Sequence, residues 1–291
     1  AWFGYAYPNW GPHTMPQSML TEVVWCLTFY FIVLCIELFP IILSNKYLDR
    51  YPAVHYFAHY LHKLMWIFAA IGTFLSFFHQ GSLGGGMWGV LYAKPYWFRH
   101  HYFYLAIVAA IAGGPCLMML APKIASWVAK KELVPKDAYM TLAQIAGVTF
   151  IAYFLFRVYD LYTLAKHFAP LFDRNLVDMS GGYYGWWVVG LELLASLVAI
   201  VILNVKKFRE NEQYFIAGLI SGVLAIVMLK VDVLLHGFSI PNFPWQDFFG
   251  YNPTIQEWFI FLGSLACMTL IYMWFVKYIP LFPEKHHEEA H

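Results

Sequence analysis

Charged side chains are scarce in this sequence: Asp, Glu, Lys and Arg together make up 12% of its 291 residues. A soluble domain usually carries about 25%. Hydrophobic residues reach 61% and aromatic residues 20%, a composition typical of helices packed in a lipid bilayer. The net charge of +1 gives no support for a nucleic-acid partner. The composition therefore predicts an integral membrane protein that is surrounded by the bilayer.

Cysteine is also rare, and the four cysteines are scattered through separate apolar runs without a CxxC pair. Iron–sulfur clusters and structural zinc sites need clustered thiolates. We therefore expect this chain to hold no iron–sulfur cluster, and we interpret the cysteines as small buried hydrophobic residues.

Seven runs of mainly apolar residues have the length of about 20 residues that a helix needs to cross a bilayer. They cover residues 20–43, 56–78, 102–121, 140–164, 184–204, 214–235 and 257–278. Long runs without strict alternation indicate helices rather than the strands of a barrel. The predicted fold class is therefore all-α, a polytopic transmembrane helix bundle.

Basic residues between the runs are distributed unevenly. Most of them follow the first, third and fifth runs or lie near the C-terminus, as with Lys130, Lys131, Lys206 and Lys207. Basic loops usually remain in the cytoplasm. The pattern predicts a multi-pass protein of the cell inner membrane, with its first residues outside and its C-terminus in the cytoplasm.

Several ionisable residues lie inside the apolar runs, where charge is costly and each one is a functional candidate. The short loop after the first run predicts that it packs antiparallel to the second, which brings Glu37 to a depth close to that of His62 and Lys63. We expect Glu37 to contact His62 or Lys63 at this depth. The contact would be either a structural ion pair or part of a proton relay.

The later runs carry a second set of ionisable residues. Arg157 and Asp160 are spaced i, i+3 and can neutralise each other. Glu192 has no local partner, and Lys230 of the LKVDVLLHG stretch is expected to reach it across the bundle. Asp232 follows Lys230, toward the outer side. Glu257 begins the last run, where a carboxylate at a helix N-terminus is ordinary and stabilising.

The second run ends in HQGSLGGG, which presents His79, Gln80 and Ser82 at the membrane edge. The stretch is no soluble phosphate loop, because no strand precedes it. Gly81 and Gly84 are expected to end the helix and to let the backbone approach a ligand. Taken alone, the spacing favours a capped helix with an interfacial histidine.

A resemblance changes this balance. The stretches IELFPIIL, HYLHKLMWIFAAIGTFLSFFHQGSLGG and GVLYAKPYW resemble the quinone-reactive membrane subunits of the NrfD/HybB (polysulfide reductase) family. The branch that includes the hydrogenase-2, DsrP and QrcD membrane subunits is the most similar. FLFRVYDL, WWVVGLELL and the last apolar run resemble the same family, in the same order.

The resemblance implies ten helices, arranged as two four-helix bundles flanked by one helix on each side. We therefore expect the sequence to lack the first part of the family's fold. Residues 1–100 would belong to the first, quinone-site bundle, residues 101–240 would form the second four-helix bundle, and residues 241–291 would hold the last transmembrane helix and a cytoplasmic tail.

The resemblance also implies a function. Such subunits bind menaquinone or ubiquinone near the outer surface, hold no haem or iron–sulfur cluster, and exchange electrons with a ferredoxin-like iron–sulfur subunit docked outside. That partner links them to a hydrogenase, a molybdoenzyme or multihaem cytochromes c. The resemblance implies that His79, Gln80 and Ser82 bind quinone. The candidates for a proton path are Glu37, His62, Lys63, Arg157, Asp160, Glu192, Lys230 and Asp232.

Two other functions remain open from the sequence. A b-type cytochrome needs histidines on two facing helices, and His79 could pair with His167 or His236. An ion-coupled transporter would also use buried charges, although no inverted repeat is visible. A haem absorption band or substrate flux would identify either one.

Overall fold

The computed structural model describes residues 19–45, 48, 50–84, 94, 96–181, 184, 186–243 and 245–279. Across these residues every regular element is a helix, which confirms the all-α prediction. The cytoplasmic tail predicted after the last helix lies outside the described residues. The chain divides into two compact units, one built on residues 21–78 and 252–291 and the other on residues 79–251.

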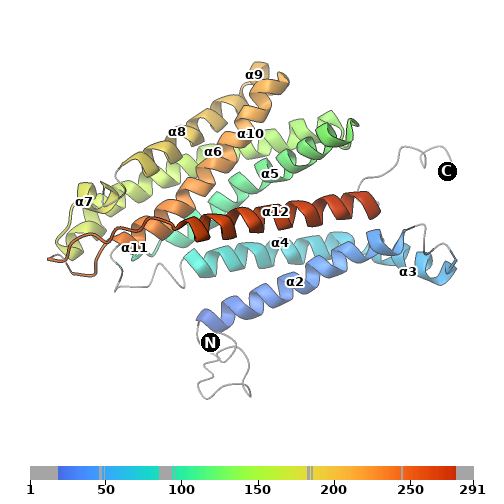
Figure 1. Cartoon of the computed structure of the whole chain (residues 1–291), viewed down its shortest axis with the longest axis horizontal. Coiled ribbons are helices and arrows are strands. Elements are labelled where there is room, and N and C mark those ends of the chain that lie inside the picture. Colours follow the sequence, from blue (N-terminus) through green and yellow to red (C-terminus); the bar gives the residue numbers. More distant parts are fainter. Residues whose placement is uncertain are drawn as a thin grey trace, which may run out of the picture. The chain divides into compact units, whose positions relative to one another are not determined.

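The first unit contains helices α2, α3, most of α4, and α12 (Figure 1). Their bounds are α2 (Met19–Leu43), α3 (Pro52–Lys63), α4 (Met65–Gly81) and α12 (Ile255–Tyr278). Helices α2 and α4 lie close together, as shown by the hydrogen bond that the Cys26 thiol donates to the Leu75 carbonyl at 3.1 Å. Helix α12 begins with a capping box between Thr254 and Glu257, which confirms the stabilising role predicted for that carboxylate.

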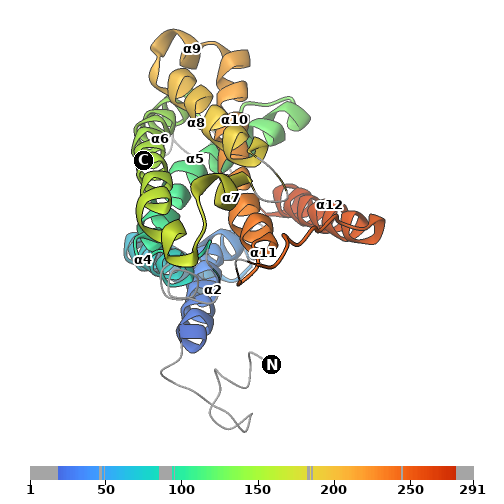
Figure 2. The ribbon, with the colours of Figure 1, turned by 90° about the vertical axis from the view of Figure 1, so that its left-hand side faces the viewer.

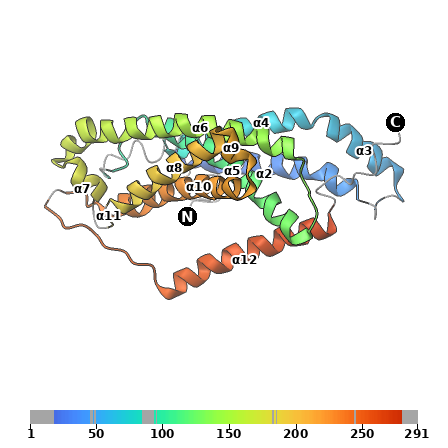
Figure 3. The ribbon, with the colours of Figure 1, turned by 90° about the horizontal axis from the view of Figure 1, so that it is seen from above.

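One predicted helix is broken in two. The run 56–78 bends by 55° between α3 and α4 (Figure 3). At the bend, the amide of Leu64 donates to the carbonyl of Leu61 at 3.0 Å, the i→i−3 spacing of a tighter turn. No proline lies there, so the break could not be predicted from the usual helix-breaking residue.

The second unit is built around a closed ring of four helices, in which each helix contacts the next (Figure 1). In the order of the ring they are α5 (Tyr102–Ala129), α6 (Lys136–Thr163), α8 (Trp187–Asn204) and α10 (Glu212–Val231). Figure 2 views this unit from the end that carries α7 (Leu176–Gly181) and α11 (Gly237–Ser239). The short α9 (Lys206–Glu210) joins α8 to α10 at the other end.

Small residues set the close spacing of the four helices. A Cβ atom on Gly222 of α10 would lie 2.7 Å from the Cys116 sulfur of α5, and one on Gly218 would lie 2.6 Å from Ile202 of α8. Alanines fill much of the remaining core, among them Ala109, Ala112, Ala143, Ala146, Ala199 and Ala225. Membrane helices pack through such small residues because lipid supplies no hydrophobic force between them.

Both helices that end beside α7 and α11 continue into a π-helical turn, which is wider than an α-helical turn. Helix α6 continues into the π-helix η3 (Leu164–Phe168) and the 3₁₀ turn η4 (Ala169–Phe172), and α10 continues into the π-helix η5 (Asp232–His236). Single π-helical turns often occur at functional sites. Among the described residues, six helices are long and apolar enough to cross a membrane, and the bent α3–α4 pair makes a seventh if it crosses as one span. The protein is therefore a multi-pass membrane protein.

Candidate functional site

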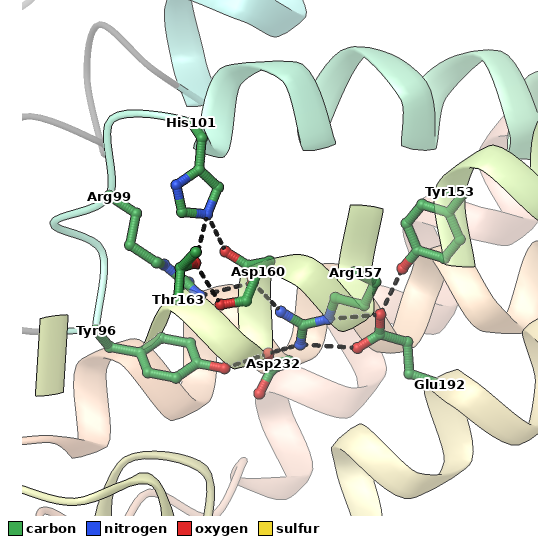
Figure 4. A network of polar contacts seen from close by, with 9 residues as sticks. All are labelled: Tyr96, Arg99, His101, Tyr153, Arg157, Asp160, Thr163, Glu192 and Asp232. Carbon is green, nitrogen blue, oxygen red and sulfur yellow. Dashed lines mark hydrogen bonds and ion pairs between the residues drawn. The ribbon is translucent and has the colours of Figure 1, made fainter. Parts of the chain in front are cut away.

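A buried network of charged side chains occupies one end of the four-helix ring, and Arg157 lies at its centre (Figure 4). The Arg157 guanidinium donates from Nε and Nη2 to the two carboxylate oxygens of Glu192, at 2.9 and 3.0 Å. It also donates from Nη1 to Asp160 and from Nη2 to Asp232, both at 2.6 Å. All four side chains are fully buried, so each depends on the others for its charge balance.

Asp160 connects this centre to the segment before α5. Its Oδ2 accepts from Arg99 Nη1 at 2.7 Å, and its Oδ1 lies 2.9 Å from His101 Nε2. The Arg99 guanidinium lies over the rings of Tyr96 and Tyr102, and its Cζ atom is 4.8 and 5.0 Å from the two ring centroids. Arg99 is fully buried, whereas the His101 side chain is 14% exposed. His101 therefore connects the network to the protein surface.

Two tyrosines complete the hydrogen bonds of the carboxylates. The Tyr153 hydroxyl donates to Glu192 Oε1, and the Tyr96 hydroxyl donates to Asp232 Oδ2, both at 2.5 Å. Burial, together with the nearby Asp232 carboxylate, raises the pKa of Tyr96 well above its ordinary value. The phenol therefore remains protonated and acts as a donor.

The segment that carries Tyr96, Arg99 and His101 is anchored on the π-helix η5. The Trp97 indole Nε1 donates to the Val233 carbonyl at 2.6 Å. Gly237 lies directly against this indole, and a Cβ atom there would overlap Trp97 Nε1. The wider turn of η5 thus positions Asp232 in the network and supplies the carbonyl that holds Trp97 in place.

The charges of this network do not sum to zero. Two guanidinium groups, of Arg99 and Arg157, face three carboxylates, of Asp160, Glu192 and Asp232. With all five ionised, the buried group carries one excess negative charge, which is costly in a low-dielectric interior. One additional proton, on His101 or on a carboxylate, would neutralise it. The arrangement can therefore hold a proton.

The structure confirms the predicted contact between Arg157 and Asp160 but not the predicted partner of Glu192. Glu192 pairs with Arg157, and Lys230 forms no ion pair with any described residue. Lys230 is half-buried and near enough to His79 for the two groups to interact electrostatically. Lys230 therefore belongs with the end of α4 rather than with the carboxylate network.

The predicted contact between Glu37 and the His62–Lys63 pair is wrong. A Cβ atom on Gly72 of α4 would lie 3.5 Å from Glu37 Oε1, so Glu37 lies beside the middle of α4. His62 and Lys63 are exposed at the end of α3. The 55° bend turns α3 away from the axis of α4. The depth expected for His62 and Lys63 assumed one straight helix and therefore no longer applies.

The HQGSLG stretch ends α4 against the start of α5. A Cβ atom on Gly84 would lie 2.7 Å from the Ala106 Cβ and 3.1 Å from the Phe103 Cα, so glycine is required for this close approach. The close approach observed at Gly84 is to α5, and the expected approach of the backbone to a ligand stays a prediction. Ser82 is buried, and Gln80 is half-buried.

His79 is also half-buried, and its Nδ1 atom is fully buried. In the described part of the chain, Nδ1 has no hydrogen-bond partner. Most buried polar atoms in proteins have a hydrogen-bond partner, so one without a partner among the described residues is a candidate for contact with a bound molecule. The His79 Nδ1 atom is therefore the best-placed atom in HQGSLG for a hydrogen bond to a ligand.

Five of the network residues drawn in Figure 4 were not predicted as site residues: Tyr96, Arg99, His101, Tyr153 and Thr163, whose hydroxyl lies 3.2 Å from His101 Nε2. Tyr153 could have been found, because it precedes Arg157 by four residues and shares its helix face. Arg99 and His101 lie in the YWFRHH stretch between two helices and were interpreted as part of a loop. One signal could have identified Arg99 and His101 as site residues. They cluster with aromatic residues on the side of the membrane where the helix of Arg157 and Asp160 ends. The side chain of His236 lies outside the described residues.

Comparisons with known proteins agree with this architecture, although no protein-family model matches the chain. The integral membrane subunit of menaquinone reductase from Nitratidesulfovibrio vulgaris is 34% identical over 98% of this chain and 68% of its own length. The probable Ni/Fe-hydrogenase 2 b-type cytochrome subunit from Escherichia coli is 22% identical over 93% of this chain and 65% of its own length. The Hdr-like menaquinol oxidoreductase integral membrane subunit from Archaeoglobus fulgidus is 24% identical over 73% of this chain and 56% of its own length.

The fold and the network define a multi-pass helical membrane protein with a buried network of charged side chains at one end of a four-helix ring. Its relatives are membrane subunits of oxidoreductase complexes. The chain belongs to the NrfD/HybB family of integral membrane subunits, as its sequence motifs predicted.

Proposed function

We propose that this chain exchanges electrons between the quinone pool and an iron–sulfur partner subunit on the outer face of the cell inner membrane. The observation that carries the proposal is the buried Nδ1 atom of His79 at the end of α4, which has no hydrogen-bond partner among the described residues. Two relatives are named for menaquinone or menaquinol, which favours menaquinone over ubiquinone as the substrate here.

The chemistry of a quinone explains why a polar group is needed at the end of an apolar helix. Reduction of a quinone takes up two electrons and two protons, so its carbonyl oxygens need a donor that can exchange protons. The His79 imidazole has this property, and Gln80 and Ser82 lie within the next turn. Lys230 supplies a positive charge close to His79. Electrons would arrive from, or leave to, the iron–sulfur partner.

The buried network gives this subunit a second role, in proton movement. One added proton would neutralise the excess negative charge of the network, and His101 is the network residue that is partly exposed. Proton uptake by the network during quinone turnover would couple electron transfer to proton translocation. The partner complex would be of the hydrogenase, molybdoenzyme or multihaem cytochrome c class, and the C-terminus would lie in the cytoplasm.

Quinone binding tests the proposal. We expect His79→Ala to weaken binding of dimethylnaphthoquinone, a menaquinone analogue, about tenfold in the purified intact complex, because one hydrogen bond to a carbonyl is lost. The measurement is a binding titration by fluorescence quenching. His59→Ala is the matched control, because His59 is exposed on α3. Equal affinity in the two variants would contradict the proposed site.

A second candidate function is a haem-binding subunit, favoured by the name of the Escherichia coli relative as a b-type cytochrome subunit. A b-type haem gives a strong Soret absorption band in the purified chain. A stoichiometric band that disappears in His79→Ala would support this function and would replace quinone by haem as the partner of Nδ1.

A further inference from the structure

The end of the four-helix ring opposite the carboxylate network carries a groove with a volume of about 730 Å³. It lies between the last turns of α5 and the first turns of α6 and α10. Its lining includes apolar Leu120, Ile124 and Ile216 together with three lysines. The groove is outside the site described above and takes no part in the proposed electron transfer.

The lysines of this groove are not all balanced by carboxylates. Lys123 donates to Glu212 at 2.9 Å and lies over the Tyr139 ring at 4.9 Å. Lys130 and Lys131 form no ion pair with the described residues. With Glu132 as the remaining carboxylate, the lining has three lysines and two glutamates. The groove therefore favours an anionic occupant.

The backbone conformation at Lys130 is unusual. Lys130 has φ 50° and ψ 32°, the left-handed conformation that normally selects glycine after a helix. The amide of Lys131 donates to the Ser126 carbonyl at 3.2 Å, and the amide of Leu133 donates to the Ser126 hydroxyl at 3.2 Å. A lysine therefore stands in a conformation where glycine would be less strained, and this makes Lys130 a candidate for a functional role.

Apolar side chains continue from the groove along the outside of α5. Ile124, Trp127 and Val128 are 54%, 81% and 60% exposed. Exposed tryptophans are typical of the membrane interface, where the ring meets both head groups and acyl chains. A ligand at this place would meet the ammonium groups of Lys130 and Lys131 at one end and an apolar surface at the other.

We propose that this groove binds an anionic phospholipid, whose phosphate pairs with Lys130 and Lys131 and whose acyl chains lie along Ile124 and Trp127. Basic pockets between transmembrane helices on the cytoplasmic side are suited to such head groups. The predicted orientation places this end of the bundle at the cytoplasmic leaflet, where anionic lipids are found.

The test uses the delipidated intact complex, titrated with cardiolipin or with phosphatidylcholine and read by native mass spectrometry. We expect wild type to bind cardiolipin at least tenfold more tightly than phosphatidylcholine. Lys130→Gln/Lys131→Gln should lose this preference, because each lysine near an anionic lipid contributes about fivefold. The control is Lys206→Gln/Lys207→Gln on α9, which changes the same charge at the same end but outside the groove.

Lys130→Gly separates lipid recognition from folding, because glycine suits the left-handed turn better than lysine does. We expect this variant to fold at least as well as wild type and to bind cardiolipin about fivefold more weakly. An unchanged cardiolipin preference in Lys130→Gly and in the double variant would overturn the proposal. Displacement of the lipid by millimolar inorganic phosphate would also overturn it, since the groove would then recognise an anion without its acyl chains.

Discussion

Replacing Arg157 with glutamine is expected to prevent the folded subunit from accumulating in the membrane. The Arg157 guanidinium makes four hydrogen bonds to three fully buried carboxylates. Removing one partner of a buried ion pair costs about 3–5 kcal/mol, because the other charge remains buried without compensation. A loss of this size is a large part of the about 5–15 kcal/mol that stabilises a typical domain. The amount of subunit in isolated membranes and the melting temperature of the purified complex measure the effect.

The double variant Arg157→Gln/Glu192→Gln is the control for this interpretation. It removes a positive and a negative charge together, and Asp160 retains Arg99 and His101 as partners. We therefore expect the double variant to regain a substantial part of the lost stability. Normal levels and an unchanged melting temperature in the single variant would show that the network is not needed for folding.

Replacing Glu192 alone with glutamine is expected to separate proton movement from electron transfer. The substitution removes the excess negative charge of the network, so no additional proton is needed for neutrality. Glutamine keeps the shape of the side chain and one acceptor for Arg157 and Tyr153. We expect quinone-linked electron transfer to remain within about threefold of wild type, since the site at His79 is unchanged. Proton translocation beyond the protons that quinone chemistry itself takes up should fall at least tenfold.

Proteoliposomes that contain a pH-indicating dye measure both quantities in one experiment. Gln80→Ala is the comparison variant, because Gln80 lies beside His79. Its replacement should lower electron transfer before it changes the ratio of protons to electrons. An unchanged ratio of protons to electrons in Glu192→Gln would contradict the role proposed for the network. It would leave the network as a structural ion cluster.

The membrane helices could be predicted from the sequence because their signal is local. A run of about 20 apolar residues defines a span by itself, and the spacing of Arg157 and Asp160 places them together on one helix. The partner of Glu192 was not local. It depends on which helices are neighbours in the ring, and the sequence does not say whether Arg157 on α6 or Lys230 on α10 reaches the Glu192 carboxylate.

The other differences also have physical causes. The bend at Leu64 arises without proline, so a straight helix was expected and Glu37 was matched with the wrong residues. His101 and Arg99 lie in a connecting segment, and their burial depends on Trp97 being held by the π-helical turn η5. A π-helical turn has no simple sequence signature, so the part of the site that it organises could not be predicted from spacing.

Quinol-linked electron transfer in the intact complex tests the central claim most directly. The comparison is between wild type and His79→Ala, at equal amounts of assembled complex and with the iron–sulfur partner still bound and reducible by a chemical donor. The account predicts that His79→Ala lowers quinol-linked turnover at least tenfold while the partner's own reduction is unchanged. Unchanged turnover would contradict it, and HQGSLG would then be a helix end that packs against α5.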